Sequence, residues 1–400
     1  YCSFTSYPLT AWKTQVDAYL DALEKELDYV AAKNYHRKLN SIYIGGGTPT
    51  TLEPYQLDRL IRKIRCSFDL GDCLEFTVEA GRPDSITEEK LLVLRKNGIS
   101  RISINPQTMK QKTLDLIGRH HTVEQTIESF RMARKLGFDN INMDLIAGLP
   151  WEDLESFKKS FNDVYEMEPE QLQLGFLKVL KGSYMEELIP TCDLLYSAAP
   201  PYEVLCTKWL SYGDVLELKD IEEMTEVHYN SRQFTCTLKE LEKEFDTPYE
   251  MFSFMAGYYN KNHLFGISHS RIARYEILWK IIQERLEKNG KCETQGKPEN
   301  GGVSEKLEQY RDLLMTDLYL RENVKSRPTF ARDLSDSKDF VREFFQREEK
   351  TPEHLSGYEG YDSRQMAKMA HLEPLRDGTY LLFDYKKRDP LSYNARTVRV

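Results

Sequence analysis

The chain has 400 residues, of which 40% are hydrophobic and 30% charged. This globular composition excludes the collagen-like, low-complexity and wholly disordered classes. Its 64 acidic and 55 basic side chains give a formal charge of −9, so the surface offers no general electrostatic attraction to nucleic acid or to anionic lipid. No run approaches ~20 apolar residues, so we expect no membrane-spanning helix.

The cysteines indicate the compartment of the protein. Seven cysteines are scattered without a repeated spacing, which does not resemble the disulfide framework of a secreted protein. We therefore expect a cytoplasmic protein with reduced thiols. The chain opens at Tyr1 without an initiator methionine or an apolar signal segment, so we expect a fragment of a longer protein.

The first 180 residues alternate apolar or β-branched runs with amphipathic stretches, after an expected helix within residues 10–30. Strands separated by helices of this length predict a parallel sheet. Five strands in series favour a barrel or partial barrel over a Rossmann half, and neither glycine-rich nucleotide motif occurs. The expected strands are 41–44, 74–79, 101–105, 141–146 and 172–177, with helices at 55–64, 87–96, 123–135 and 154–164.

The pattern changes after the break at Pro200-Pro201. The following stretch is mostly helical and rich in Leu, Tyr and Glu, and the glycines and charges before residue 304 have no periodicity. We expect four parts: a core domain over residues 1–185, a helical domain over 200–290, a linker over 291–304, and a helical segment over 305–400 that ends in a strand near 379–385.

Polar or glycine features lie at or near the carboxyl ends of four of the predicted strands. They are the turn Gly45-Gly46-Gly47-Thr48-Pro49, then Glu79, Gln107 and Asp144. In a parallel barrel, ligands bind at the carboxyl ends of the strands. Consecutive glycines let a ligand lie directly on backbone N–H groups. Each feature alone would be a turn or a capping group, but four on one edge favour a ligand site.

Five motifs in the first half carry a family resemblance. They are Ile44-Gly-Gly-Gly-Thr-Pro-Thr50, Glu79, Ser103-Ile-Asn-Pro-Gln107, Ile117-Gly-Arg-His-His121 and Asp144-Leu-Ile-Ala-Gly-Leu-Pro150. Together they resemble the radical S-adenosylmethionine (SAM) enzymes. Residues 1–150 are most similar to the oxygen-independent coproporphyrinogen oxidases, in particular the HemZ-type coproporphyrinogen dehydrogenases. The resemblance implies an α/β fold, a partial TIM-like radical SAM barrel lacking its first strand, followed by a mostly α-helical C-terminal region.

The resemblance also implies two cofactors. In this family a Cys-x-x-x-Cys-x-aromatic-Cys loop holds a [4Fe–4S] cluster, and SAM completes the coordination of the fourth iron. Tyr1-Cys2-Ser3-Phe4 is similar to the end of that loop, with Tyr1 as the aromatic residue and Cys2 as a metal ligand. Because the first two cysteines of the loop are absent and no other cysteine has the spacing to replace them, we expect this chain not to assemble the cluster and to be inactive.

The SAM contacts are carried over motif by motif. Gly46, Gly47 and Thr48 would meet the amino and carboxylate end of the methionine. The rest of SAM would be bound by four side chains whose polar groups suit a ribose and a zwitterion, namely Glu79, Gln107, Arg119 and Asp144. Lys158 is expected on the exposed face of a barrel helix, far from the strand ends, so its substitution is a control for tests of these contacts.

Residues 151–400 resemble a different branch, the C-terminal part of cobalamin-binding-domain radical SAM proteins. The two halves thus suggest one superfamily and two subfamilies. A natural recombinant, a new subfamily and an assembly artefact all remain open. No Asp-x-His-x-x-Gly occurs, so we expect no cobalamin site of the chain's own.

The implied activity is oxygen-independent coproporphyrinogen III oxidase-like: a 5′-deoxyadenosyl radical abstracts hydrogen from a propionate side chain, which then loses carbon dioxide. The implied partners are a small-molecule substrate, with a porphyrinogen as candidate, and an electron donor such as flavodoxin or ferredoxin. Two alternatives stay open. One is a cobalamin-branch radical SAM protein of unassigned substrate, and the other is a non-catalytic SAM-binding or interaction fragment.

Overall fold

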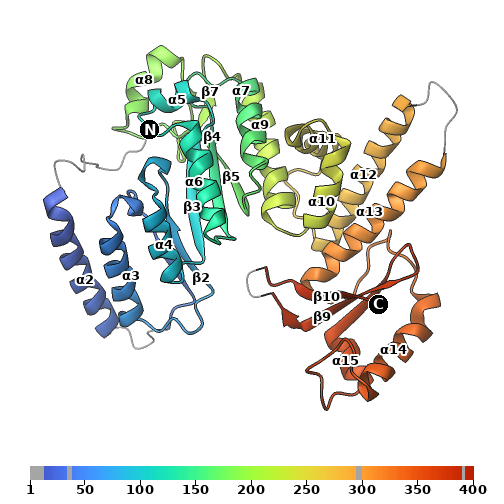
Figure 1. Ribbon diagram of the computed structural model, residues 1–400. Coiled ribbons are helices and arrows are strands. Elements are labelled where there is room, and N and C mark those ends of the chain that lie inside the picture. The colour runs from blue at the N-terminus through green and yellow to red at the C-terminus, as the bar shows by residue number, and fades with distance from the viewer. Residues whose placement is uncertain (1–12, 34–37, 294–299, 390–391) are drawn as a thin grey trace. The chain divides into compact units, whose positions relative to one another are not determined.

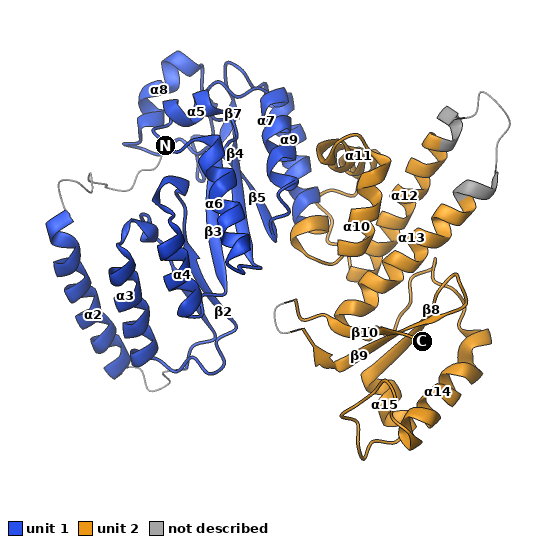
Figure 2. Ribbon diagram, viewed as in Figure 1, with its two compact units in different colours: residues 1–226 blue, residues 227–400 orange. Residues whose placement is uncertain are grey.

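The computed structural model describes residues 13–33, 38–293, 300–389 and 392–400. These residues form two compact units, 1–226 and 227–400, shown in separate colours in Figure 2. Each unit has its own sheet and its own buried side chains.

A five-stranded parallel sheet forms the centre of the first unit, with its strands in the order β1-β2-β3-β4-β5 (Figure 1). The predicted α/β fold is confirmed, and the strand ends differ from the prediction by one or two residues at most. The strands are β1 (Ser41–Ile44), β2 (Glu75–Glu79), β3 (Arg101–Gln107), β4 (Ile141–Ala147) and β5 (Gln171–Phe176). The helices are α2 (Val16–Lys33), α3 (Pro54–Ser67), α4 (Glu88–Lys96), α5 (Gln111–Leu116), α6 (Val123–Lys135) and α7 (Leu154–Tyr165).

The two faces of this sheet differ in chemistry because side chains alternate along a strand. On one face, Ile102 and Ile104 of β3 and Met143 of β4 are fully buried, and α6 and α7 contact these two strands. Burying each such side chain contributes roughly 1.5–3 kcal/mol. The opposite face carries polar residues at the alternate positions, including Ser103 and Asn142, which pair across β3 and β4.

Side-chain caps fix where several helices of the first unit begin. Thr122 Oγ1 accepts a hydrogen bond from the Gln125 N–H at 3.2 Å, and Asp153 Oδ1 accepts one from the Ser156 N–H at 2.9 Å. Such caps satisfy N–H groups that have no partner inside the helix. They explain why the predicted starts of α6 and α7 agree with the structure.

The first unit extends beyond the predicted core domain. After α8 (Tyr184–Cys192), strands β6 (Leu195–Tyr196) and β7 (Val204–Cys206) pair antiparallel, and α9 (Tyr212–Met224) contacts β5 and β7. Lys219 of α9 lies 2.5 Å from a carboxylate oxygen of Glu203 and 4.2 Å from the centre of the Phe176 ring. The division between the units therefore falls after residue 226, inside the helical domain predicted over 200–290.

The second unit begins with helices and ends with an antiparallel sheet. Its helices are α10 (Thr235–Leu241), α11 (Pro248–Lys261), α12 (Arg271–Glu293), α13 (Asn300–Arg321), α14 (Lys338–Lys350) and α15 (Ser363–Met369). Since α12 ends at Glu293 and α13 starts at Asn300, the predicted linker 291–304 overlaps both helices; residues 294–299 lie outside the described ranges.

The chain does not end in the single strand expected near 379–385. That strand is β9 (Tyr380–Arg388), and it lies between β8 (Ala370–Pro374) and β10 (Ala395–Arg399) in the order β10-β9-β8. The prediction missed β8 and β10 because both are short and only their pairing with β9 defines them. Leu372 and Leu382, paired across β8 and β9, are buried against Phe344 of α14 and Met366 of α15.

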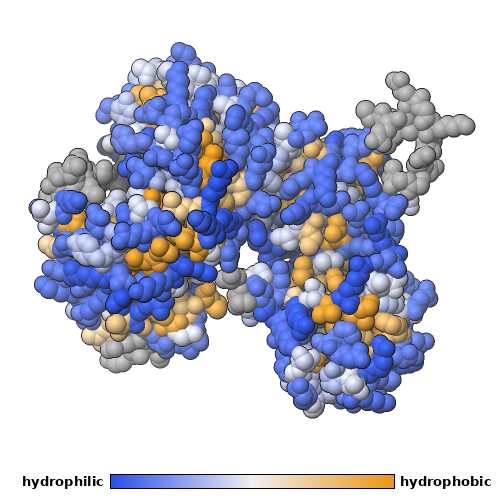
Figure 3. Space-filling view, in the orientation of Figure 1, coloured by the Kyte–Doolittle hydropathy of each residue, from blue (hydrophilic) through white to orange (hydrophobic). Residues whose placement is uncertain are grey.

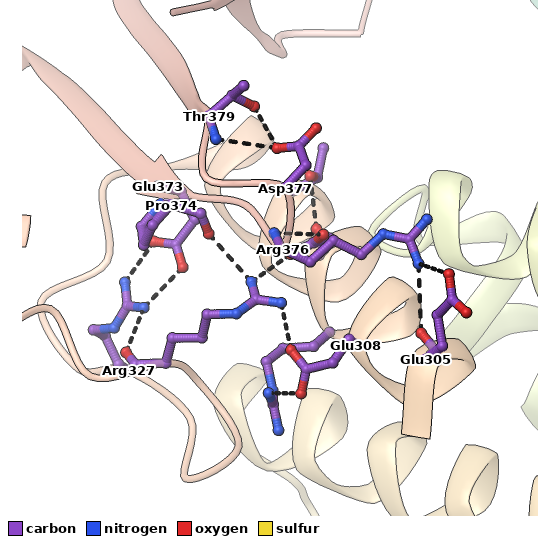
Figure 4. Close-up of polar contacts among 12 residues, drawn as sticks. Glu305, Glu308, Arg327, Glu373, Pro374, Arg376, Asp377 and Thr379 are labelled. Carbon is purple, nitrogen blue, oxygen red and sulfur yellow. Dashed lines mark hydrogen bonds and ion pairs between the residues drawn. The ribbon is translucent and has the colours of Figure 1, made fainter. Parts of the chain in front are cut away.

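An ion-pair network joins α13, the segment after it and β8 (Figure 4). The Arg327 guanidinium donates two hydrogen bonds to the Glu373 carboxylate, at 2.6 and 2.8 Å, and Glu373 is only 1% exposed. Arg332 donates to Glu308 of α13 at 2.6 Å and to the Pro374 carbonyl at 3.2 Å. These contacts tie α13 and the segment after it to β8.

The surface visible in Figure 3 is mostly hydrophilic, with separate hydrophobic patches on each unit. In the part of the chain that the structure describes, no helix is long and apolar enough to cross a membrane. At the outer strand of the first sheet, Tyr43 is 61% exposed.

Candidate functional site

A glycine turn directly follows β1. Gly46 has φ +102°, a left-handed conformation that favours glycine, and a Cβ atom at Gly46 or Gly47 would meet nothing within 4 Å. The Thr48 carbonyl accepts the Thr51 N–H at 2.9 Å, which fixes the following 3₁₀ turn, Pro49–Thr51. Beside Gly46 and Gly47, the turn thus leaves open space.

The structure brings together the four polar side chains predicted from separate strands and loops. Gln107 Nε2 donates a hydrogen bond to Asp144 Oδ2 at 2.7 Å, across the ends of β3 and β4. Arg119, between α5 and α6, donates to the Gly81 carbonyl at 2.9 Å, two residues beyond Glu79 at the end of β2. Gln107 is 2% exposed and has φ +69°, an uncommon conformation for a residue other than glycine.

The carboxyl group of Asp144 is strongly perturbed by its surroundings. Burial raises the pKa of its carboxyl to about 6; Arg119 and the hydrogen bond from Gln107 oppose that shift, and the charge of Glu79 adds to it. Asp144 Oδ1 is buried and accepts no hydrogen bond from the described residues. A buried acceptor without a donor fits a ligand that brings a hydroxyl or an ammonium group.

Sequence reasoning missed three side chains here. The Tyr43 hydroxyl donates a hydrogen bond to Glu79 Oε1. The amide oxygens of Asn105 and Asn142 are buried and have no partner within the described ranges. The sequence does not show the strand register that would have identified Tyr43. In the structure, Tyr43 pairs with Thr77 and therefore lies on the same face of the sheet as Glu79.

The predicted site residues Tyr1 and Cys2 lie outside the described residues. Five cysteines in the described ranges are free thiols, and no three of those thiols lie close enough to share a metal. Among the described residues, three potential metal ligands that lie close together are Glu348, Glu353 and His354. The Glu348 carboxylate already accepts the N–H groups of Glu353 and His354. The described residues therefore do not fit a [4Fe–4S] cluster.

The proposed control residue is less exposed than expected. The side chain of Lys158 is only 29% exposed and pairs with Glu155 at 2.9 Å. Lys159 of the same helix is 75% exposed. Lys158 lies beside Phe157, which is buried in the core, whereas the next residue points outward. Lys159 is therefore the better control.

Comparison with known families matches two separate stretches of the chain. Residues 1–164 match the family described as the radical SAM superfamily, and residues 191–388 match one described as a protein of unknown function, DUF4080. The resemblance of residues 1–150 to radical SAM enzymes is thus confirmed. The resemblance of residues 151–400 to the cobalamin branch stays a prediction.

Three individual proteins illustrate the similarity. The oxygen-independent coproporphyrinogen-III oxidase-like protein HemZ of Bacillus subtilis is 44% identical over 188 residues, which cover 46% of this chain and 38% of that protein. The heme chaperone HemW of the same organism is 35% identical over 218 residues, or 53% and 57% of the two chains. The solved coproporphyrinogen III oxidase of Escherichia coli is 28% identical with a TM-score of 0.44, covering 52% of this chain and 45% of that one.

The chain spans less than two thirds of the length of either curated relative. The family match covers strands β1–β4 of the parallel sheet, the glycine turn and all four converging side chains, and it ends before β5. Residues 1–164 of this chain are thus similar to the radical SAM superfamily.

Proposed function

We propose that the first unit binds SAM at the carboxyl ends of its strands, as the SAM-binding part of a radical SAM enzyme. The convergence of Glu79, Gln107, Arg119 and Asp144 beside the glycine turn carries this proposal. These residues come from three strands and a loop, and a purely structural role would not require them to meet. The site fits SAM because Asp144 Oδ1 is a buried acceptor that lacks a donor.

Each group would have a distinct task toward SAM. The open backbone at Gly46 and Gly47 would receive the methionine end, with Thr48 beside it. The Glu79 and Asp144 carboxylates would accept hydrogen bonds from hydroxyl or ammonium groups, and Arg119 would donate to an anionic group. Gln107 would hold Asp144 in place through its 2.7 Å hydrogen bond.

When bound and reduced by one electron from a donor, SAM would supply hydrogen-atom abstraction from the substrate, the chemistry of this family. The part played by this chain would be to orient SAM and keep water away from it. No described residue is assigned to the [4Fe–4S] cluster. An electron donor such as flavodoxin or ferredoxin and a small-molecule substrate belong to the same proposal.

For the substrate itself we propose a porphyrinogen, as the name of the HemZ relative suggests. The name of the HemW relative favours a second candidate, binding of haem without oxidation of a porphyrinogen. Anaerobic titration of the chain with coproporphyrinogen III and, separately, with haem distinguishes them. Saturable binding of the porphyrinogen alone supports an oxidase-like role, and a haem Soret shift alone supports the chaperone-like role.

Isothermal titration with SAM tests the site itself. Glu79→Ala removes an anionic acceptor, and we expect the affinity to fall about ten- to a hundredfold, since a charge-assisted hydrogen bond contributes ~1.5–3 kcal/mol. The matched control is Lys159→Ala, a change of one charge at an exposed position on α7. Equal SAM affinity in the two variants would contradict the proposed site.

A further inference from the structure

The side chain of Tyr43 links the glycine turn to Glu79. Tyr43 is the third residue of β1, and its hydroxyl donates a hydrogen bond to Glu79 Oε1 at the end of β2. The register makes this contact possible, because Tyr43 pairs with Thr77 and therefore shares a face with Glu79, two residues farther along. No motif from the sequence includes Tyr43.

Gly45 lies against the same two side chains. A Cβ atom at Gly45 would lie 2.4 Å from Tyr43 Cε1 and 3.3 Å from Glu79 Cδ. The first distance is far below any van der Waals contact, so an alanine here would have to displace the tyrosine ring. The absence of a side chain at Gly45 thus makes room for the ring, and the ring holds its hydroxyl against the carboxylate.

The electrostatics agree with this geometry. Burial and the neighbouring Glu79 carboxylate raise the pKa of the Tyr43 hydroxyl to about 12. The phenol therefore keeps its proton, and its role as hydrogen-bond donor, throughout the neutral pH range. Although the Tyr43 residue as a whole is 61% exposed, its hydroxyl contacts Glu79 Oε1.

We propose that Tyr43 is a positioning residue of the SAM site, which holds the Glu79 carboxylate in its binding orientation beside the glycine turn. This inference rests on the proposed function. Tyr43 acts through Glu79 rather than on SAM directly, so removal of its hydroxyl should matter only while residue 79 offers that hydroxyl an acceptor.

A double-mutant cycle on SAM binding tests this dependence. By isothermal titration we expect Tyr43→Phe to weaken SAM binding about three- to tenfold in the wild-type background and to have no effect in the Glu79→Ala background, where the hydroxyl has lost its acceptor. A purely structural role of the tyrosine would give the same loss in both backgrounds. The matched control is Tyr55→Phe, which removes another exposed phenol. Tyr55 lies on α3, and its hydroxyl donates a hydrogen bond to Asp17 of α2 at 3.2 Å.

A measurement without SAM checks the contact itself. In protein labelled with ¹³C at tyrosine Cζ, the Tyr43 signal, assigned by its loss in Tyr43→Phe, should not titrate up to about pH 11. In Glu79→Gln it should begin to titrate below pH 11, because removal of the negative charge lowers the pKa of the phenol. The same titration curve in both proteins would overturn the proposed contact.

The outcomes separate this inference from the proposed function. If Glu79→Ala weakens SAM binding but Tyr43→Phe does not, the SAM site stands and the role of Tyr43 is wrong. If wild type fails to bind SAM or Glu79→Ala binds as wild type does, the proposed function fails, and the role of Tyr43 fails with it. Equal losses from Tyr43→Phe in both backgrounds would also overturn the inference.

Discussion

At the scale of the residue, Asp144 carries a conflict between stability and function. Burial disfavours its ionised form and raises the pKa to about 6, although Gln107 and Arg119 stabilise the charge. An apolar or amide side chain would avoid this cost. Its presence within a core strand, β4, suits a group that is needed for binding.

The variant Asp144→Asn should therefore be more stable than the wild type above pH 6, by up to ~2 kcal/mol. The native pKa lies above the unfolded value of 3.8, so the native state binds more protons between these values, and wild-type stability falls as pH rises through that window. Urea unfolding at pH 4, 5, 6 and 8 measures the difference, which should shrink toward the acid end. The opposite trend would show that ionised Asp144 stabilises the fold.

The natural comparison is Asp153, which caps α7 and whose pKa is lowered, chiefly by its hydrogen bonds with Ser156. Asp153→Ala should cost about 1 kcal/mol at pH 7. Because the folded pKa is depressed, that contribution is present above the unfolded pKa and is lost as pH falls through the folded value. The two aspartates should thus show opposite pH dependences in the same unit.

At the scale of the element, the short helix α10 is held by a side chain from another helix. Asp317 of α13 is 1% exposed and accepts the N–H groups of Cys236 and Thr237, both at 2.9 Å, and the Thr237 hydroxyl at 2.7 Å. These are first-turn donors that no intrahelical carbonyl can satisfy. Burial raises the pKa of Asp317, and these hydrogen bonds oppose the shift.

We expect Asp317→Asn to destabilise the second unit by about 2 kcal/mol or more, because an amide offers one oxygen where the carboxylate uses two. Urea unfolding gives the free energy, and hydrogen exchange should show the amides of Cys236 and Thr237 among those that lose protection. Asp339→Asn, at an acidic position of α14 whose side chain is 80% exposed, is the control. Equal effects of the two substitutions would rule out a special role of the buried cap.

The contact of Arg327 with Glu373 joins the segment after α13 to β8 (Figure 4). Removing the cation by Arg327→Ala leaves a carboxylate that is 1% exposed without its main partner, and we expect a loss of about 3–5 kcal/mol. Arg327→Ala combined with Glu373→Gln should recover part of that loss, because no buried charge then remains. Thermal unfolding of the variants measures both effects, and a double variant less stable than Arg327→Ala would contradict the explanation.

At the scale of the whole molecule, the boundary after residue 226 can be tested directly. The second unit has its own sheet with a core between α14, α15 and β8–β9, and α12 packs along α13. We expect residues 227–400 alone to fold and to unfold cooperatively, as followed by circular dichroism. Because α9 contacts β5 and β7 of the first unit, adding residues 200–226 should not increase the stability of that fragment. A fragment that folds only from residue 200 onward would favour the boundary predicted from the sequence.

The sequence by itself determined the parallel sheet and the place of its site. Alternation of apolar runs with amphipathic stretches specifies β1–β5 and their helices, because burial follows the local period of each element. The glycine turn, Glu79, Gln107 and Asp144 could be assigned to one edge without coordinates, since parallel strands end on the same side.

Only the tertiary structure decided how these groups interact. The contact of Tyr43 with Glu79 depends on register, the pKa of Asp144 depends on burial, and the cap on α10 comes from a residue some 80 positions away. Strands β8 and β10 likewise became visible only through their pairing with β9. Local periodicity fixes which face a side chain takes, whereas register, desolvation and long-range hydrogen bonds exist only once distant segments meet.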